Sequence, residues 1–340
     1  MKILIVTQAV DRVHPILGFF HRWIEEFARQ CDSVTVIGQQ VGDHALPDNV
    51  RVLSLGKEEE RSRLRQILRF WMLQWELRHQ YDVVFVHMTP VWMVLGTPIW
   101  LMMRKHRHLW YEARRGGWML RGALLSSRRA FSATQEGIPF PSLKKRIHGH
   151  GIDTSFFSPS SPEDREAGLL VAVGRITPIK HIELFIDALA KLPSFYRLLL
   201  IGIPFTEQDH EYLTSLWLRA RERGVDHRLS IQALPHVEMP FVLRRAVLFL
   251  HAGGGGLDKA LLEAMSCECL VLSASQSARS ILPSHCTADP HNFSDRARAL
   301  LSLPWSERLA IGSALREQVQ KLHSLPVLIH WLIGEMGGCN

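Results

Sequence analysis

Three residues in the second half of the sequence could contact a ligand: two cations that suit a phosphorylated group, and one carboxylate that requires a partner. Arg175 closes an apolar run, and Lys180 follows five residues later at the start of a helical pattern. A fixed Arg and Lys can neutralise the charge that develops on a diphosphate leaving group. Glu263 lies within another helical pattern on an otherwise apolar face, where a carboxylate requires a partner. The alternative interpretation is that the two cations lie on the surface and the glutamate is solvated.

Four consecutive glycines, at positions 253–256, separate an apolar run from the helical pattern that contains Glu263. Glycine lets the backbone approach a ligand closely, and the first turn of a helix offers unpaired N–H groups to an anion. A loop without a ligand is the alternative interpretation. The residues expected to bind phosphates through backbone N–H groups are Gly254, Gly255, Gly256 and Leu257.

Apolar runs of strand length alternate with helical patterns along the whole chain, which predicts two doubly wound parallel sheets. In the first half the expected strands are 2–7, 33–38, 50–55, 82–87, 108–113 and 130–134, with helices at 18–29, 60–79 and 88–103. In the second half the expected strands are 169–175, 196–202, 229–233, 247–250 and 269–272. One helix is expected there from about residue 181, and three more at 208–224, 238–245 and 257–267. Two further helices are expected in 304–340. Ligands are expected at the carboxyl ends of the strands.

The composition describes a folded globular protein, since 46% of the residues are hydrophobic and 21% are charged. The five cysteines are odd in number and scattered, which argues against a disulfide framework or a zinc site. The uncharged stretch 88–103 contains two prolines and is shorter than the ~20 residues that span a bilayer, so we interpret it as a buried helix. Without a signal peptide, the expected location is cytoplasmic.

The net charge of +7 arises mainly in the first half, where residues 101–150 hold eleven Lys and Arg against Glu112 and Glu136. Seven of the ten tryptophans also lie in the first half. Basic residues interleaved with aromatics are typical of a surface that binds nucleic acid or anionic lipid. Since no nucleic-acid motif is present, we expect an anionic membrane surface as a partner. The alternative is that these cations only solubilise the domain.

Three segments resemble family-4 retaining glycosyltransferases, group 1 enzymes of the GT-B fold. They are LLEAMSCECLVLSA (261–274), the G-R-x4-K pattern formed by Gly174, Arg175 and Lys180, and GHGIDTSFF (149–157). The resemblance implies two Rossmann-like domains facing across a crevice. We expect an acceptor-side domain at 1–155, a nucleotide-sugar domain at 156–320, and a C-terminal helix at 321–340 that crosses back to the first domain.

The resemblance also implies roles for individual residues. Arg175 and Lys180 would stabilise the diphosphate, Glu263 would bond the ribose, and the helix start ahead of it would face the phosphates. Gly18 matches a glycine near the donor phosphates, and His87 matches a histidine near the acceptor. A lone histidine at a strand end also occurs as a purely structural residue.

Three positions depart from the family pattern. The earlier of two family glutamates falls at Gly255, and a family histidine falls near Ala113, beside Glu112 and Arg114. Glu268 replaces the glycine that ends the donor-site helix, where a non-glycine residue at positive φ costs on the order of 1 kcal/mol.

The expected function is retaining transfer of a sugar from a nucleoside diphosphate sugar to a saccharide or lipid-linked acceptor in cell-surface glycan synthesis. No cofactor is expected besides the donor substrate, and no metal, since the chain has no D-x-D pair to hold a cation. Two alternatives remain open. One is a GT-B epimerase or phosphorylase, and the other is a nucleotide-sugar-binding protein that has lost its chemistry.

Overall fold

The computed structural model describes residues 1–14, 17–113, 115–254 and 256–337, and these form two compact units. The first unit contains Met1–Gly151 and the segment that begins at His323, and the second contains Ile152–Leu322. The divisions predicted from the sequence fall close by, after residues 155 and 320.

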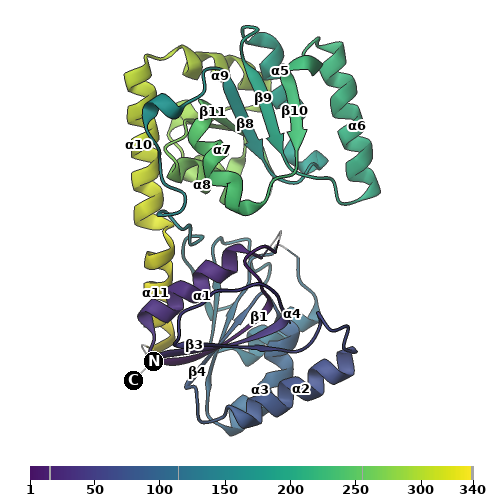
Figure 1. The fold of residues 1–340 in the computed structure, drawn as a ribbon, viewed down its shortest axis with the longest axis vertical. Helices are drawn as coiled ribbons and strands as arrows, with labels where there is room; N and C mark the ends of the chain where they lie inside the picture. The colour runs from purple at the N-terminus through teal and green to yellow at the C-terminus, as the bar shows by residue number, and fades with distance from the viewer. Residues whose placement is uncertain (15–16, 114, 255, 338–340) are drawn as a thin grey trace. The chain divides into compact units, whose positions relative to one another are not determined.

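The first unit is built on a parallel sheet (Figure 1). Within the described residues its seven strands follow the order β3-β2-β1-β4-β5-β6-β7. The strands are β1 Lys2–Val10, β2 Ser33–Val41, β3 Val50–Ser54, β4 Val83–His87, β5 His106–Trp110, β6 Arg129–Ser132 and β7 Lys145–Ile147. All six pairs of neighbours are parallel. The first six strands were predicted, whereas β7 was not, because it is short and begins with two cations.

Side-chain alternation along the strands divides the core of the first unit in two. Ile3 and Ile5 of β1 pack into one cluster with helix α1, while Leu4 and Val6 pack into the other. Successive side chains of a strand point to opposite faces, so the sheet is apolar on both. The helices of this unit are α1 Phe19–Gln30, α2 Arg63–Glu76, α3 Pro90–Met102, α4 Trp118–Ser126 and α11 Leu325–Gly337.

Helices α1 and α11 cover one face of this sheet, and α2, α3 and α4 contribute to the cluster on the other. The last helix buries Leu328, Ile329 and Leu332 beside α1. Its Glu335 accepts a hydrogen bond from Arg129 of β6 at 2.7 Å. The C-terminal helix is therefore an integral part of the first unit.

The second unit contains a parallel five-stranded sheet in the order β10-β9-β8-β11-β12. The strands are β8 Leu169–Val173, β9 Arg197–Ile201, β10 Leu229–Gln232, β11 Leu248–His251 and β12 Val271–Ser273. The helices are α5 Glu183–Lys191, α6 Glu207–Glu222, α7 Met239–Arg245, α8 Lys259–Ser266, α9 Phe293–Ser302 and α10 Trp305–Leu322. Residues from these strands and helices form one hydrophobic cluster.

A residue with strained backbone follows helix α8, as predicted from the sequence. Glu268 has a φ of +56°, in the left-handed region that favours glycine. The carbonyl oxygen of Glu268 would lie 2.3 Å from a Cβ placed on Gly312 of α10. The absence of a side chain at Gly312 therefore lets α10 approach the end of α8.

The sequence predicted a buried helix at 88–103, and the structure has α3 at Pro90–Met102. Trp92, Met93 and Trp100 of α3 are buried, but Leu101 and Met102 are exposed, so only one side of this helix is covered. Among the described residues, no helix combines the length and hydropathy required to cross a bilayer.

Candidate functional site

The carboxyl ends of β8, β11 and β12 lie next to one another in the second sheet and carry the polar groups of the candidate site. The chain runs outward from β8 through β9 to β10 on one side, and then continues at β11 on the other side. Such a reversal of strand order is where ligands bind in doubly wound sheets. His251, the last residue of β11, pairs in register with Ser273, the last residue of β12.

Arg175 and Lys180 both follow β8 at this edge. Gly174, at the end of the strand, has a φ of +152°, and a Cβ on Gly202 would lie 1.9 Å from its carbonyl oxygen. Arg175 is exposed, and among the described residues its side chain forms no ion pair. Lys180 ends a short 3₁₀ helix, Pro178–Lys180, and its side chain is only 18% exposed. The two residues predicted to bind the diphosphate therefore differ, since Arg175 is exposed to solvent and Lys180 is held by another side chain.

Lys180 is held by Asp258, a residue that was not predicted from the sequence. The ammonium group donates to Oδ2 of Asp258, and Nε2 of His251 donates to the same oxygen at 2.8 Å. Burial alone raises the pKa of Asp258, but the hydrogen bond from His251 and the charge of Lys180 outweigh burial and lower the pKa below its usual value. Asp258 is therefore an anion at neutral pH.

The glycine loop between β11 and α8 packs against the segment that carries Lys180. A Cβ on Gly253 would lie 3.0 Å from the Nζ atom of Lys180 and 2.9 Å from Oδ2 of Asp258. The N–H group of Gly254 donates to the carbonyl oxygen of Ile179 at 2.9 Å, so it already has a partner. These two glycines are therefore explained by close packing as well as by ligand access.

The other predicted phosphate ligands in this loop are Gly255, Gly256 and Leu257. Gly255 lies outside the described residues. Gly256 is partly exposed, and its carbonyl oxygen accepts a hydrogen bond from Ser277 at 2.9 Å. Leu257 is partly exposed and lies just before Asp258, the residue that precedes α8. Their role in phosphate binding stays a prediction.

Glu263 of α8 is buried, with 7% of its surface exposed, so the interpretation as a solvated residue is wrong. Its Oε1 atom accepts a hydrogen bond from Nε2 of His236 at 2.9 Å. His236 is 30% exposed and lies beside the rings of Phe156 and Phe157. The partner that a buried carboxylate requires is therefore a histidine from the segment between β10 and α7. The predicted contact with a ribose is untested.

In the first unit, His87 is enclosed by aromatic side chains. The residue is 1% exposed, its ring stacks on Phe20 at a centroid distance of 3.8 Å, and Nδ1 lies 3.1 Å from Oγ1 of Thr7. This environment favours the structural alternative noted for a histidine at a strand end. Contact with an acceptor stays a prediction.

Gly18 lies directly before α1, as expected. A Cβ at this position would lie 2.8 Å from the carbonyl oxygen of Arg12 and 2.9 Å from that of His14. The described structure therefore requires a glycine for backbone packing, and a role near donor phosphates stays a prediction.

Glu112 follows β5 at the position where the family pattern has a nearby histidine. Its carboxylate accepts hydrogen bonds from Ser132 Oγ at 2.6 Å, from the N–H groups of Ala133 and Thr134, and from Thr134 Oγ1 at 2.6 Å. Both oxygens are engaged, so Glu112 joins the ends of β5 and β6 and is poorly placed to act as a base. Ala113 donates its N–H to the carbonyl of Gly137 and offers no catalytic side chain.

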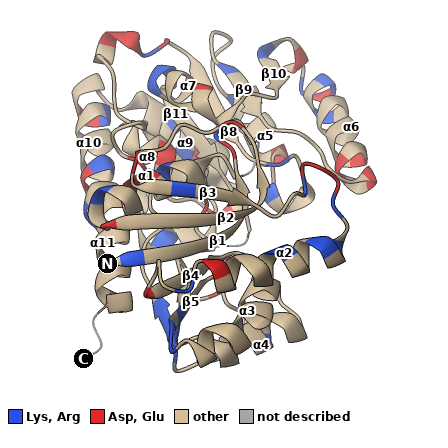
Figure 2. Cartoon of the chain, turned by 60° about the horizontal axis from the view of Figure 1, so that its bottom comes forward, with Lys and Arg blue, Asp and Glu red and all other residues tan. Residues whose placement is uncertain are grey.

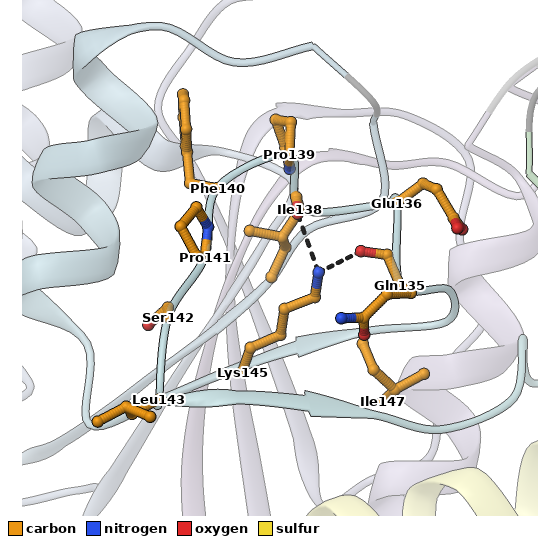
Figure 3. A pocket seen from close by; sticks show the side chains of 10 residues that line it. All are labelled: Gln135, Glu136, Ile138, Pro139, Phe140, Pro141, Ser142, Leu143, Lys145 and Ile147. Atoms are coloured by element: carbon orange, nitrogen blue, oxygen red, sulfur yellow. Dashed lines mark hydrogen bonds between the residues drawn. The ribbon is translucent and has the colours of Figure 1, made fainter.

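An open surface hollow lies beside the loop between β6 and β7 in the first unit (Figure 3). Its single cation, Lys145, donates to the carbonyl oxygens of Gln135 and Ile138, which hold the loop between β6 and β7. The hollow is lined by Gln135, Glu136, Ile138, Pro139, Phe140, Pro141, Ser142, Leu143, Lys145 and Ile147. We assign it no part in the candidate site.

No group of three or more His, Cys, Asp or Glu side chains among the described residues is arranged to hold a metal ion. The described cysteines, Cys31, Cys267, Cys269 and Cys286, are buried and unpaired. Burial raises the pKa of Cys267 and Cys286 to about 12, so these two thiols are protonated at neutral pH.

Part of the second unit matches the model of a known protein family. Residues 167–303 match the family model described as "Glycosyl transferases group 1". No curated protein matches the chain in sequence.

Solved structures with a similar fold extend the likeness to the whole chain. HepE from Anabaena, crystallised with UDP, has a TM-score of 0.75 at 16% identity, with 99% of this chain and 100% of that chain covered. Sucrose-phosphate synthase from Thermosynechococcus elongatus has a TM-score of 0.71 at 14% identity, with 99% of this chain and 100% of that chain covered. The lipopolysaccharide outer core galactosyltransferase WaaB has a TM-score of 0.66 at 12% identity and covers both chains fully. The predicted fold, GT-B with two Rossmann-like domains, is confirmed.

Proposed function

We propose that this chain, whose residues 167–303 match the group 1 glycosyltransferase family model, transfers a sugar from a nucleoside diphosphate sugar with retention at the anomeric carbon. The observation that supports the proposal best is the meeting of Arg175, Lys180 and the start of α8 at the switch point of the second sheet. Two cations and a helix N-terminus suit a diphosphate whose charge rises as the glycosidic bond breaks. Glu263, buried on the same helix, would bond the ribose.

UDP-glucose is the first donor to test. Crystal structures of HepE with UDP, and with UDP-glucose, share the fold of this chain over 98% or more of its length. The identity is 16%, so the sugar and the base are open for this chain. Arg175 and Lys180 would contact the diphosphate, so they would not distinguish one base from another.

A thermal-shift panel with UDP-glucose, GDP-mannose and ADP-glucose tests donor binding. A ligand at one hundred times its Kd stabilises the folded state by about 2.7 kcal/mol, which is a readily measured shift. We expect one of these donors to raise the unfolding temperature of the wild type and to lose most of that effect with Arg175→Ala. Arg221→Ala, an exposed arginine of α6, is the matched control. If no sugar nucleotide shifts the transition, the proposal is wrong.

The acceptor we propose is a lipid-linked saccharide at a membrane surface, as in the making of cell-surface glycans. The supporting observation is the outer face of α2, opposite the face that buries Phe70 and Leu73. Apolar side chains separated by 4, 7, 8 and 11 residues lie on one side of a helix. The exposed members of this stripe, each with between 40% and 67% of its surface exposed, are Leu64, Leu68, Trp71, Met72 and Trp75.

Charge and neighbouring helices extend this apolar stripe into a surface suited to lipid. Exposed Arg63 and Arg65 lie on either side of the stripe in helical projection. Trp71 donates from Nε1 to the carbonyl of Leu95 in α3 at 2.9 Å, and exposed apolar residues continue on α3 and α4. Figure 2 shows few charged residues on α3 and α4. Tryptophan and arginine beside aliphatic side chains are typical of helices that lie in a membrane interface.

Several of the basic residues in 101–150 are committed within the protein. Arg129 pairs with Glu335 at 2.7 Å, and Lys144 donates to the carbonyls of Leu124 and Leu125. Arg114 lies outside the described residues. The exposed stripe of α2 is therefore the better target for substitution.

Co-sedimentation with vesicles tests the membrane proposal. We expect binding to vesicles that contain anionic lipid, weaker binding to zwitterionic vesicles, and partial release by a few hundred millimolar salt as the electrostatic field is screened. The double variant Leu68→Glu, Trp75→Glu should bind poorly, while Leu218→Glu, at a 54% exposed leucine of α6, should bind like the wild type. Absence of wild-type binding at low salt would favour a soluble acceptor.

Two other functions predict different products. A GT-B epimerase would act on the sugar nucleotide without a glycan acceptor, whereas a phosphorylase would cleave a glycosidic bond with inorganic phosphate and form a sugar phosphate. A binding protein that has lost its chemistry, through Gly255 and Ala113, would bind the donor and release no nucleotide. Measuring nucleotide release with and without an acceptor, and sugar phosphate formation with inorganic phosphate, separates these functions.

A further inference from the structure

Asp258 occupies the position directly before α8, where an aspartate usually accepts hydrogen bonds from the first turn of the helix. In this protein its side chain forms no such bond. Its Oδ2 atom instead accepts hydrogen bonds from Lys180 and from His251. The carboxylate is therefore directed away from the helix and toward Lys180, at the end of the 3₁₀ helix Pro178–Lys180.

His251, the last residue of β11, fixes the orientation of Asp258. It is 4% exposed, donates from Nε2 to Asp258 at 2.8 Å, and places Nδ1 2.7 Å from Oγ of Ser273. Since a carboxylate only accepts, Nε2 must carry a hydrogen. Ser273 is fully buried, and its Oγ also accepts the N–H of Ser275 at 3.1 Å. A continuous chain of hydrogen bonds thus runs from β12 through β11 to Lys180.

The backbone around Lys180 is shaped to hold its side chain in this direction. Gly253 leaves room for the contact, because a Cβ there would lie within 3.0 Å of both Lys180 Nζ and Asp258 Oδ2. The N–H of Gly254 ties the loop to Ile179, the residue before Lys180. A lysine is a flexible point charge, and such a site restricts it to one place before any ligand arrives.

We propose that Asp258, supported by His251, is a positioning residue that holds the Lys180 ammonium group where the donor diphosphate must bind. This inference rests on the proposed function. An ammonium group has three donor hydrogens, so the contact with Asp258 leaves two for phosphate oxygens. Preorganised cations stabilise developing charge without reorganisation during the reaction, which is the benefit of holding Lys180 in advance.

The same contact has an opposite effect on ground-state binding. Asp258 and Lys180 together carry no net charge, so Asp258 weakens the attraction of the site for an anionic nucleotide. Removing the carboxylate frees the lysine but leaves its charge uncompensated. Ground-state binding should then strengthen while the chemical step slows, a combination that damage to the fold does not produce.

The experiment compares Asp258→Ala with the wild type, using UDP in calorimetry and the active donor in steady-state kinetics. We expect kcat to fall by about 10-fold or more, and UDP affinity and the apparent donor affinity (1/KM) to stay constant or rise by several-fold. Lys180→Ala should lower both kcat and UDP affinity. Glu317→Ala, which removes an exposed carboxylate paired with Lys321 on α10, is the matched control and should change neither.

A double-mutant cycle shows whether Asp258 acts through Lys180. In the Lys180→Ala background, Asp258→Ala should produce little further loss of kcat, because the group that it positions is absent. Full additivity of the two losses, or wild-type kcat in Asp258→Ala, overturns the inference while leaving the proposed glycosyl transfer intact. Weaker UDP binding by Asp258→Ala than by the wild type also overturns it. If the wild type neither binds UDP nor turns over a sugar nucleotide, both the proposed function and this inference fail.

Discussion

The imidazole of His236 donates a hydrogen bond from Nε2 to Oε1 of Glu263 at 2.9 Å, where the proposed donor would place its ribose. The carboxylate is buried, while the histidine is 30% exposed. Glu263 therefore has one oxygen held by the protein, which would orient the other toward a ribose hydroxyl.

His236→Ala should weaken binding of UDP by about 10-fold, since a hydrogen bond to a charged group contributes ~1.5–3 kcal/mol. The loss should be specific to the ribose, so the wild type should prefer UDP over 2′,3′-dideoxy-UDP and the variant should lose much of that preference. His210→Ala, at an exposed histidine of α6, is the control. Equal discrimination in the wild type and His236→Ala would exclude a role in ribose recognition.

Arg175→Ala should lower kcat by about 10²-fold without unfolding the protein, because it removes a cation that stabilises the charged leaving group. Arg175 is exposed, and among the described residues it forms no ion pair that the fold would lose. Activity is measured as nucleotide release at saturating donor, and circular dichroism confirms folding. A kcat within a few-fold of the wild type would remove Arg175 from the mechanism.

Excess EDTA should leave transfer activity essentially unchanged. We expect cationic side chains and the start of α8 to take the part that a divalent cation plays in enzymes with a carboxylate pair. The assay compares initial rates before and after dialysis against chelator, with magnesium or manganese added back. Activity that disappears and returns with either metal would contradict this assignment.

The first unit should lose stability as the pH falls below about 6.5. Burial, followed by nearby cationic groups, lowers the pKa of His108 to about 3, and neither ring nitrogen has a hydrogen-bond partner among the described residues. The unfolded chain binds a proton near pH 6.5 and the folded chain does not, so stability is lost between pH 6.5 and 3.

Between pH 6.5 and 4.5 this single group accounts for roughly 2–3 kcal/mol. His108→Leu removes the titrating ring and should flatten the dependence of the unfolding temperature on pH. His79→Leu, at an exposed histidine, should leave the slope unchanged. An equally steep slope in His108→Leu would show that other groups dominate acid unfolding.

Glu268→Gly should stabilise the second unit by about 1 kcal/mol, because glycine adopts a φ of +56° without steric cost. Glu268→Ala keeps the Cβ and should give no comparable gain, which separates backbone strain from side-chain effects. Denaturant unfolding of the three proteins measures the difference. Equal stability of the glycine and alanine variants would show that the strain is relieved elsewhere.

The sequence predicted most of the fold because buried parallel strands are nearly continuous apolar runs, as in Leu169–Val173. It failed where that signal is weak. β5 begins at His106, two residues before the predicted start, because His106 and Arg107 are polar residues inside a strand. Helix α4, Trp118–Ser126, was missed because its apolar residues follow two glycines without a clear helical start signal.

The candidate site was predicted less completely than the fold. Arg175, Lys180 and Glu263 were predicted from spacing and resemblance, but Asp258, the partner of Lys180, and His236, the partner of Glu263, were not. These contacts join residues 78 and 27 positions apart, and no local pattern announces a pairing over such distances. One signal in the sequence pointed to a partner for Glu263, since a buried carboxylate requires a hydrogen-bond donor.

The return of α11 to the first unit has a consequence for synthesis on the ribosome. Strands β1–β7 emerge early, but Leu328, Ile329 and Leu332, which cover part of their sheet, are made only after the whole of Ile152–Leu322. At ~5–20 residues per second this delay is on the order of ten seconds or more. Throughout that interval the part of the first sheet that α11 covers has no partner from the end of the chain. The first unit, although its strands are made first, can therefore be completed only when the last helix has been made.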